Sequence, residues 1–464
     1  MRLDRPRVII AGVTSASGKT TVTTGLIGAL VRRGVSVQAF KTGPDYIDPS
    51  YHTAASGRPS RNLDSWLLDP PALVEFFARA ATPAQVTVIE GVMGLFDGRN
   101  GGGEEGSTAH LAKLTRTPVL LVIDVGKTSR SAAATVLGFR DFDPDLPLAG
   151  VILNQVGSET HDRWVTEAIE TLTGLPVVGR FPKQPELGLP ERHLGLVPVN
   201  ERRVTEDWIA LLGETAAGGL DLAAIDRIMR SAPPLDCPET GLFPPEPRPA
   251  AVRLGVAQDE AFGFYYADTL DLLAAWGAEL VPVSPLRDRG LPTGLDGLYL
   301  GGGFPEEFAS ELAANTLFLT GLRAAAVGES GRAGPLLIYA ECGGLMYLSQ
   351  GIETFDGQRY PLAGLVPGWS VMRKRRVSLG YRAVAGRPGN FLLGAGESVR
   401  GHEFHWSELA EPLGEDQAAY RVTMPADRPE GFLRGRLLAS YIHLHFGSRA
   451  SLAPNLIAAL QSSS

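Results

Sequence analysis

The sequence predicts an α/β protein made of two parallel-sheet domains. In the first half of the chain, short apolar runs alternate with longer helix-like segments; the runs are residues 7–11, 35–40, 86–89, 118–123 and 148–153. This alternation is typical of a parallel sheet covered by helices. A second alternation follows a proline-dense stretch, with runs at residues 252–257, 278–283, 297–300, 336–339 and 440–443. The 464 residues suffice for two or three domains, each with its own core.

Proline density sets the predicted domain boundary. Residues 231–250 hold closely spaced prolines, which support neither a helix nor a central strand. We therefore expect an amino-terminal domain over residues 1–230, a linker over 231–250 and a carboxyl-terminal domain over 251–464. Cys237 lies in this linker, and we expect no role for it.

Composition excludes several classes of protein. Hydrophobic residues make up 44% of the chain and charged residues 20%, but no apolar run reaches the ~18 residues of a membrane span. No secretory pattern is seen, so we expect a cytoplasmic protein without a membrane partner. The net charge of -8, with both signs interspersed, argues against nucleic acid. The chain has two cysteines, too few for a disulfide framework.

A glycine-rich segment after the first apolar run predicts a phosphate-binding loop. Gly12 and Gly18 are separated by five residues, one more than usual, and a helix-like stretch follows. In this setting backbone N–H groups cradle phosphates, Lys19 reaches the terminal phosphates and Thr20 holds Mg²⁺. ATP with Mg²⁺ is the expected ligand. The predicted nucleotide-binding residues of the loop are Gly12, Ser17, Gly18, Lys19, Thr20 and Thr21.

Acidic residues at strand ends are the expected metal ligands and activating groups. Glu90 ends the run 86–89, where an acid that binds a nucleotide-bound Mg²⁺ belongs. Asp45 and Asp48 follow the second run, and Asp97 lies in a turn after Glu90. Turns that end α/β strands line the ligand crevice, although aspartates in such turns also cap their own backbone. We take Thr20, Asp48 and Glu90 as metal ligands.

Asn154 ends the run 148–153 and has two interpretations. Its amide either hydrogen-bonds the nucleotide base or belongs to an ordinary strand-end turn, and the sequence favours neither.

Residues 336–346 predict a nucleophile elbow that carries a cysteine. A buried strand is followed by Cys342 and by a helix that opens on Gly343 and Gly344. Small neighbours are needed because such an elbow is strained and closely packed. We expect the helix N-terminus to lower the thiol pKa. An ordinary buried cysteine would explain neither the glycines nor the strand boundary.

A thiol nucleophile needs a base and donors for the developing oxyanion. His443 and His445 share strand spacing, which predicts one common face, and His443 is the expected base. Gly302 and Gly303 lie in a glycine-rich strand end, and their N–H groups, with that of Gly343, are the expected oxyanion donors. A tight structural turn explains the first two glycines equally well.

A pair of histidines and a basic run give weaker evidence of a functional site. His402 and His405 invite a zinc hypothesis, which we disfavour because strand spacing does not place them on one face. The basic run 372–376 favours a solvated loop over a site for an anionic substrate.

With both sites in hand, the chain resembles from end to end the a,c-diamide synthases that act on cobyrinic or hydrogenobyrinic acid. The amino-terminal half also resembles dethiobiotin synthetase, and the carboxyl-terminal half a class I glutamine amidotransferase with a flavodoxin-like fold. The segments that carry the resemblance are 18–21, 41–49, 62–64, 90–98, 192–196, 301–306, 340–344, 379–381, 401–405 and 441–443.

The resemblance implies that two peripheral carboxylates of a tetrapyrrole are amidated in turn. Each carboxylate is activated by ATP as an acyl phosphate and is attacked by ammonia from glutamine. The implied roles are nucleotide or metal binding for Lys19, Thr20, Glu90 and Lys41, activation or substrate binding for Asp45, Tyr46, Asp48, Asp64 and Asp97, and glutamine hydrolysis for Cys342 and His443. Class I enzymes place a glutamate two residues after the base. Here that position is His445, so the resemblance implies a Cys–His pair without that acid.

Other substrates and another class stay open. Glutaminase chemistry would be the same with metal-free hydrogenobyrinate, nickel sirohydrochlorin or a cell-wall lipid precursor, but Tyr46 and residues 52–66 favour cobyrinate, with a role in cobalamin biosynthesis. A P-loop switch ATPase would carry a lysine at Thr14 and would need no cysteine elbow. The expected partners are glutamine and a tetrapyrrole polycarboxylate. The sequence leaves the oligomeric state open, with a homodimer as one alternative.

Overall fold

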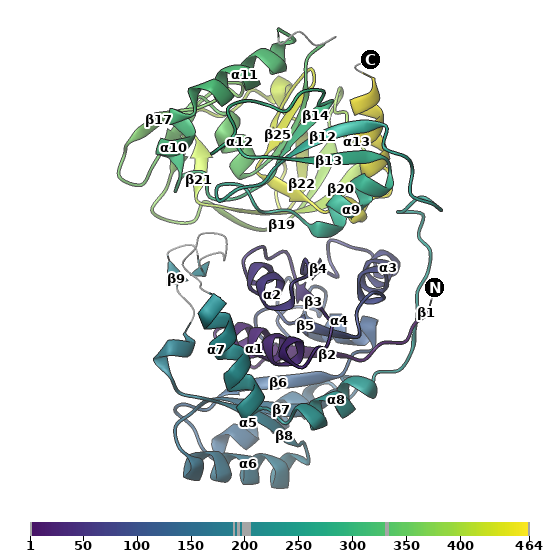
Figure 1. Cartoon of the computed structure of the whole chain (residues 1–464), viewed down its shortest axis with the longest axis vertical. Coiled ribbons are helices and arrows are strands. Elements are labelled where there is room, and N and C mark those ends of the chain that lie inside the picture. The colour runs from purple at the N-terminus through teal and green to yellow at the C-terminus, as the bar shows by residue number, and fades with distance from the viewer. Residues whose placement is uncertain (1, 189–190, 193–194, 197–205, 330–333, 463–464) are drawn as a thin grey trace. The chain divides into compact units, whose positions relative to one another are not determined.

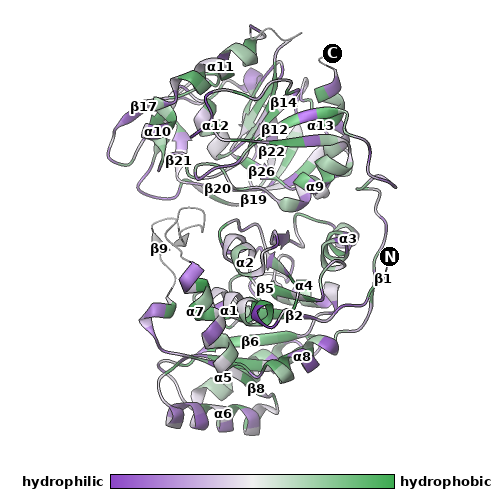
Figure 2. Cartoon of the chain, viewed as in Figure 1, coloured by the Kyte–Doolittle hydropathy of each residue, from purple (hydrophilic) through white to green (hydrophobic). Residues whose placement is uncertain are grey.

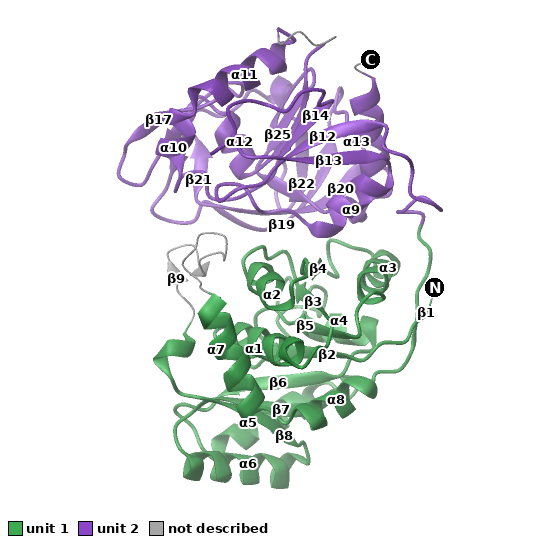
Figure 3. Ribbon diagram, in the orientation of Figure 1, with its two compact units in different colours: residues 1–240 green, residues 241–464 purple. Residues whose placement is uncertain are grey.

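The computed structural model describes residues 2–188, 191–192, 195–196, 206–329 and 334–462 (Figure 1). The chain divides into two compact units, Met1–Thr240 and Gly241–Ser464 (Figure 3). The division falls inside the predicted linker at 231–250. The first part of that segment nevertheless belongs to the amino-terminal unit, because β11 (Leu235–Asp236) pairs antiparallel with β1 (Arg2–Leu3). Cys237 is buried there, and its thiol donates to the Leu235 carbonyl.

A seven-stranded parallel sheet forms the centre of the described amino-terminal unit, as the apolar runs predict. In spatial order its strands are β4 (Arg61–Leu63), β3 (Val37–Thr42), β5 (Val86–Glu90), β2 (Arg7–Gly12), β6 (Val119–Asp124), β7 (Leu148–Val156) and β8 (Val177–Pro182). The outer strands β4 and β8 do not stand out in the sequence, since one has three residues and the other contains Gly179, Arg180 and Pro182. The short β9 (Glu191–Arg192) and β10 (Gly195–Leu196) pair antiparallel. Residues 193–194 of the 192–196 motif lie outside the described residues.

Helices cover both faces of this sheet. They are α1 (Lys19–Arg32), α2 (Asp48–Ser56), α3 (Pro70–Ala81), α4 (Thr108–Thr115), α5 (Ser131–Phe142), α6 (Glu159–Thr173), η1 (Pro185–Leu187), α7 (Glu206–Gly219) and α8 (Leu222–Arg230). On one face, buried side chains of α1, α7 and α8 share a core with alternate residues of the central strands. On the other face, Phe40 of β3 meets Phe77 of α3 edge to face, with ring centroids 5.1 Å apart.

The strand order explains where a ligand site can form. From β2 the chain passes through α1 to β3, and from β5 it crosses back through α4 to β6, so β2 lies at the point where the order reverses. Crevices at the carboxyl ends of strands at such a point bind ligands. The phosphate loop follows β2 directly, and Glu90 ends the adjacent β5.

A second parallel sheet forms the centre of the carboxyl-terminal unit. Its spatial order is β13 (Ala278–Val283), β12 (Val252–Ala257), β14 (Gly297–Leu300), β15 (Leu337–Glu341), β25 (Leu437–Ser440) and β24 (Phe432–Arg434), with β24 antiparallel to the others. The predicted run at 440–443 is divided, since β26 (Ile442–Leu444) leaves this sheet and joins another one. Strand parallelism, which the alternation predicts, is confirmed for β12 to β15 and β25.

The unit also contains one mixed sheet and one antiparallel sheet, which the sequence pattern does not predict. One consists of β17 (Arg359–Pro361), β16 (Gly351–Glu353), β18 (Ser370–Met372) and β21 (Ser407–Leu409), of which only β16 and β18 run parallel. The other consists of β23 (Arg428–Glu430), β22 (Tyr420–Met424), β19 (Ser378–Gly386), β20 (Ser398–His405) and β26. The basic run after β18 is exposed from Arg373 to Arg376, as a solvated loop should be.

The helices of this unit are α9 (Ala267–Ala275), α10 (Ala309–Ala314), α11 (Thr316–Val327), α12 (Gly343–Leu348), η3 (Glu415–Gln417), η4 (Phe446–Ser448) and α13 (Leu452–Gln461). Buried side chains of α10, α11 and α12 pack with β14 and β15 into one core, which includes Cys342. Figure 2 shows hydrophobic residues along the central strands of both units, and hydrophilic ones on helices such as α6. Among the described residues, no helix is long and apolar enough to cross a membrane.

Candidate active sites

The phosphate loop joins β2 to α1 and depends on its two glycines. Gly18 has a left-handed φ of 94°, and a Cβ there would lie 2.0 Å from Nδ2 of Asn154. A Cβ on Gly12 would lie 2.2 Å from the Ser17 hydroxyl. Asn154 itself donates to the Ser17 carbonyl at 3.0 Å. Its amide therefore supports the loop, a contact that neither sequence interpretation includes. Thr21 is half-buried in the first turn of α1.

Lys19 folds back over the loop. Its ammonium donates to the carbonyl of Thr14 at 3.1 Å and to that of Met93 at 2.6 Å. Met93 has a φ of 47°, so its carbonyl is held by a backbone that non-glycine residues rarely adopt. Burial, together with the positive charge of Lys41, lowers the pKa of Lys19 to about 8.

Glu90 and Lys41 form the buried centre of this site. Glu90 accepts hydrogen bonds from the Thr20 hydroxyl at 2.8 Å and from Lys41 at 2.9 Å. Lys41 also contacts Asp48 at 2.6 Å and Asp45 at 3.9 Å. Burial disfavours the charged form of Lys41. The carboxylates of Asp48, Glu90 and Asp45 outweigh this effect and hold the pKa of Lys41 above its usual range. Two of the predicted metal ligands, Asp48 and Glu90, thus share one ammonium, and the third, Thr20, bonds Glu90.

His52 completes the Glu90 cluster, and sequence reasoning missed this contact. Its Nε2 lies 2.6 Å from the second Glu90 oxygen, and both side chains are fully buried. Burial raises the pKa of Glu90, but Lys41 and His52 outweigh it and hold that pKa well below its usual range. The available signal was spacing: His52 follows Asp48 by four residues on α2, which puts both on one helix face.

The turn aspartates make the backbone contacts that their alternative interpretation describes. Asp45 accepts the N–H of Ile47 at 2.8 Å, and Asp97, which is exposed, accepts that of Gly94 at 2.9 Å. Each of these contacts uses one carboxylate oxygen, and the other oxygen of Asp45 lies 3.9 Å from Lys41. A role in activation stays a prediction.

Asn62 bonds the turn that precedes α2, whereas Asp64 bonds the turn that follows β4. Asp64 is buried and accepts the N–H groups of Trp66 and Leu67 at 2.8 and 2.9 Å. Asn62, which was not singled out as a site residue, donates to the carbonyls of Gly43 and Asp45 at 2.8 and 2.6 Å. Tyr46 is half-buried in the turn before α2.

In the carboxyl-terminal unit, Cys342 occupies the predicted elbow between β15 and α12. Its φ of 49° and ψ of -103° are strained for a non-glycine residue, at a cost of about 1–3 kcal/mol. The following glycines allow this close packing, because a Cβ on Gly344 would lie 2.3 Å from the Leu300 carbonyl. The Cys342 N–H donates to the Ser440 carbonyl at 2.7 Å, which ties the elbow to β25.

The expectation of a lowered thiol pKa is wrong for this structure. Burial raises the pKa of Cys342 well above its ordinary value, and the charge of Glu306 adds to the shift. The N–H of Gly343 acts in the opposite direction but is outweighed. The thiol therefore needs a base to become a nucleophile.

His443 and the glycine loop meet beside the elbow. A Cβ on Gly302 would lie 2.5 Å from Cε1 of His443, and a Cβ on Gly343 would lie 3.0 Å from the nitrogen of Gly303. The loop thus packs against both the predicted base and the residue after the nucleophile. Nδ1 of His443 lies 3.7 Å from a carboxylate oxygen of Glu341. The structure brings the predicted glutaminase residues together, and it adds this carboxylate, which sequence reasoning missed.

The other histidines have separate surroundings. His445 does not accompany His443: its ring lies 4.8 Å from that of Tyr266, and its Nε2 is 4.0 Å from Asp268. His402 pairs with His443 across β20 and β26. Burial lowers the pKa of His445 to about 3, and burial with the charge of His443 does the same for His402.

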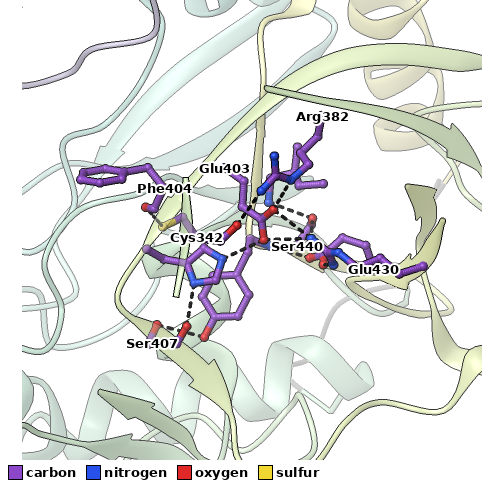
Figure 4. Close-up of polar contacts among 12 residues, drawn as sticks. Cys342, Arg382, Glu403, Phe404, Ser407, Glu430 and Ser440 are labelled. Atoms are coloured by element: carbon purple, nitrogen blue, oxygen red, sulfur yellow. Dashed lines mark hydrogen bonds and ion pairs between the residues drawn. The ribbon is translucent and has the colours of Figure 1, made fainter. Parts of the chain in front are cut away.

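Glu403 lies at the centre of a buried ionic network (Figure 4). His405 belongs to this network. Glu403 accepts from Nε2 of His405 at 2.8 Å, from Arg382 at 2.5 Å and from Arg428 at 2.8 Å. The neighbouring Phe404 carbonyl lies 3.8 Å from the Cys342 sulfur. Glu403 and Phe404 are neighbours in β20, so the network around Glu403 fixes the backbone that contacts Cys342. Its signal in the sequence was the alternation of Glu403 and His405 along one strand face.

Comparison with known proteins assigns a class to each unit. Residues 8–197 match the family described as the CobQ/CobB/MinD/ParA nucleotide binding domain, and residues 253–451 match the CobB/CobQ-like glutamine amidotransferase domain. The fold and the two sites therefore define a nucleotide-dependent glutamine amidotransferase. More particularly, the chain belongs to the cobyrinate a,c-diamide synthase family.

Three relatives show this. The cobyrinate a,c-diamide synthase of Dehalococcoides mccartyi strain 195 is 46% identical, with 97% of each chain covered. The Priestia megaterium protein of that name is 44% identical, over 97% of this chain and 96% of the relative. The hydrogenobyrinate a,c-diamide synthase of Streptomyces coelicolor is 41% identical, with 97% of each chain covered. The resemblance read from the motifs is confirmed.

Proposed function

We propose that this protein amidates the a and c side-chain carboxylates of cobyrinate, using ATP and glutamine-derived ammonia, in cobalamin biosynthesis. The observation that carries the proposal is the presence in one chain of two complementary sites. One is a phosphate loop with converging carboxylates, and the other is a strained cysteine elbow beside a histidine. The names of the relatives support the corrinoid substrate.

In the first site, a substrate carboxylate oxygen would attack the terminal phosphorus of ATP, and ADP would leave. Backbone N–H groups of the loop and the ammonium of Lys19, which contacts the Thr14 carbonyl of that loop, would hold the phosphates. Ammonia then attacks the acyl carbon, and phosphate leaves. Asp45, Asp48 and Asp97 would orient the substrate or accept the proton that the attacking nitrogen loses. Tyr46 and Asp64 would contact the substrate.

The donor set of this site fits a magnesium ion. The Thr20 hydroxyl and the carboxylates of Asp48 and Glu90 are hard oxygen donors, and they converge within 3 Å contacts of one another or of Lys41. When bound, the ion would neutralise charge on the transferred phosphoryl group. His52 would keep the second Glu90 oxygen in place.

In the second site, Cys342 would attack the side-chain amide of glutamine. The thiol proton passes to His443, the amide carbon becomes tetrahedral, and N–H groups of Gly302, Gly303 and Gly343 would stabilise the oxyanion. His443 returns the proton as ammonia leaves, and water then hydrolyses the thioester to glutamate.

Two experiments test the proposal. Purified protein is incubated with ATP, magnesium, glutamine and either cobyrinate or metal-free hydrogenobyrinate, and products are followed by mass spectrometry. Conversion of two carboxyl groups of cobyrinate to amides is expected. If neither macrocycle is amidated, the assignment is overturned. Faster reaction of hydrogenobyrinate would correct the substrate.

The second experiment uses Cys342→Ala. We expect this variant to lose all glutamine-supported amidation but to keep the ammonia-supported reaction. Cys237→Ala serves as the matched control, because that cysteine lies outside both sites. Equal loss with both nitrogen sources would make Cys342 structural.

A further inference from the structure

A buried carboxylate stands directly before the nucleophile. Glu341 ends β15, is 1% exposed and lies one residue before Cys342. One of its oxygens accepts from the Tyr339 hydroxyl at 2.5 Å and from the Leu444 N–H at 2.9 Å. The other accepts from the Tyr299 hydroxyl at 2.9 Å. Burying an ionised carboxylate is costly unless it is hydrogen-bonded, and three donors supply that compensation.

These donors are uncharged, and among the described residues no lysine or arginine forms an ion pair with the carboxylate. The two tyrosines stay neutral, since burial and the charge of Glu341 raise the pKa of both well above the ordinary value. In the described part of the chain, the basic group within ion-pair distance is His443, at 3.7 Å through Nδ1. The carboxylate is therefore arranged so that His443 is the group that gains from it when protonated.

Backbone bonds hold the carboxylate and the imidazole in this relation. The Leu444 N–H, one residue after His443, donates to Glu341 itself, and the Cys342 N–H donates to the Ser440 carbonyl. On its other side the ring rests against Gly302 through Cε1. With Nδ1 toward Glu341 and carrying a proton, the opposite ring nitrogen Nε2 is the atom that can act as the base.

We propose that Glu341 is the positioning residue of the glutaminase site: it orients His443 with a proton on Nδ1 and stabilises the imidazolium formed when Cys342 transfers its proton to Nε2. This inference rests on the glutaminase role proposed above. It replaces the expected unassisted Cys–His pair, because an acid from the neighbouring strand β15 takes the place of one two residues after the base. His445, which occupies that later position, is engaged with Tyr266 and Asp268.

The test uses the full chain and the isosteric variant Glu341→Gln. We expect glutamine-supported turnover to fall on the order of 100-fold, the scale of positioned acid–base catalysis, with little change in KM for glutamine. Ammonia-supported amidation should be unchanged, which shows that the variant is folded. Glu341→Asp should recover part of the loss. Unchanged glutamine-supported turnover in Glu341→Gln would overturn the proposal.

The pH profile separates positioning from a structural effect. Loss of the negative charge should move the acidic limb of kcat/KM for glutamine to lower pH, because the imidazolium is less stabilised. Tyr299→Phe should move it to higher pH, because one neutral donor no longer competes for the oxygen nearest Nδ1. Shifts of the same sign in both variants would contradict the proposal.

Asp259→Asn is the matched control. Asp259 is a buried carboxylate of the same unit that accepts from the N–H groups of Ala261 and Leu286 and from Ser284. This variant should lower thermal stability without moving the limb, and an equal shift would make the effect of Glu341 structural. Absence of glutamine-supported activity in the unaltered protein would instead defeat the proposed function, and this inference with it.

Discussion

Lys19 shows how one residue's environment sets the conditions for ligand binding. The residue is 7% exposed, and its ammonium donates to the carbonyls of Thr14 and Met93. Burial and the nearby Lys41 lower its pKa to about 8. A phosphate at the loop would favour the charged form and raise that pKa again. Nucleotide binding and proton uptake are therefore linked through this side chain.

We predict that ATP binding takes up a proton in alkaline solution. At about pH 9 the free Lys19 is mostly neutral and must be protonated on binding, whereas at about pH 6.5 it is already charged, so affinity falls as the pH rises through 8. Titration calorimetry in two buffers of different ionisation enthalpy measures the uptake. Lys19→Arg, which stays charged, should abolish it. Equal uptake in this variant would assign the proton to another group.

At the scale of elements, both sites are built from tight connections after parallel strands. The loop after β2 needs Gly18 in a left-handed conformation, and the elbow after β15 holds Cys342 in a strained one. Between β14 and α10, the glycine loop packs against His443 through Gly302. Each connection brings backbone close to a functional side chain, so added atoms there should alter function before they alter the fold.

Gly302→Ala tests this at the glutaminase site. The new Cβ would lie 2.5 Å from Cε1 of His443, which must move, and displacement of a catalytic group by about 1 Å can cost 100-fold in rate. We expect that loss in glutamine-supported amidation and none in the ammonia-supported reaction, both measured by steady-state kinetics.

The matched control is Gly321→Ala in α11, where a Cβ would meet nothing within 4 Å. It should keep full activity and gain helix stability, since alanine is the better helix former. Full glutamine-supported activity in Gly302→Ala would show that the loop tolerates the methyl group and that His443 is not confined by it.

At the scale of the whole molecule, each of the two units has its own hydrophobic core. One cluster draws its residues from Val8 to Met229 and the other from Ala257 to Tyr441, so neither crosses the division at Thr240. Activation and glutamine hydrolysis are therefore carried by units that each have a core of their own.

We predict two thermal transitions that respond independently. Phe181→Ala should destabilise the amino-terminal unit by about 3–5 kcal/mol, and Leu322→Ala the carboxyl-terminal unit by about 2–5 kcal/mol, since both side chains are fully buried. Scanning calorimetry should show one transition lowered in each variant, and ATP should raise the one that Phe181→Ala lowers. Equal lowering of both transitions by either substitution would mean that the units unfold together.

The sequence alone predicts much of this protein. Alternating apolar runs predict both parallel sheets, and glycine spacing predicts the phosphate loop and the elbow at Cys342. These features depend on neighbours along the chain, because backbone conformation at a glycine and periodicity in a strand are local properties. Strands such as β4 and β8 were not predicted because they are short or interrupted, and the two smaller sheets of the carboxyl-terminal unit because most of their strands have only three to five residues.

Only the tertiary structure decided how the site residues act on one another. Glu341 and His443 are about a hundred positions apart, and Lys41 and Glu90 about fifty, yet each pair is brought within ion-pair distance by strand order. Burial also reversed the expected direction of the Cys342 pKa. Distances and desolvation between remote segments follow from packing in three dimensions, and local sequence patterns do not encode them.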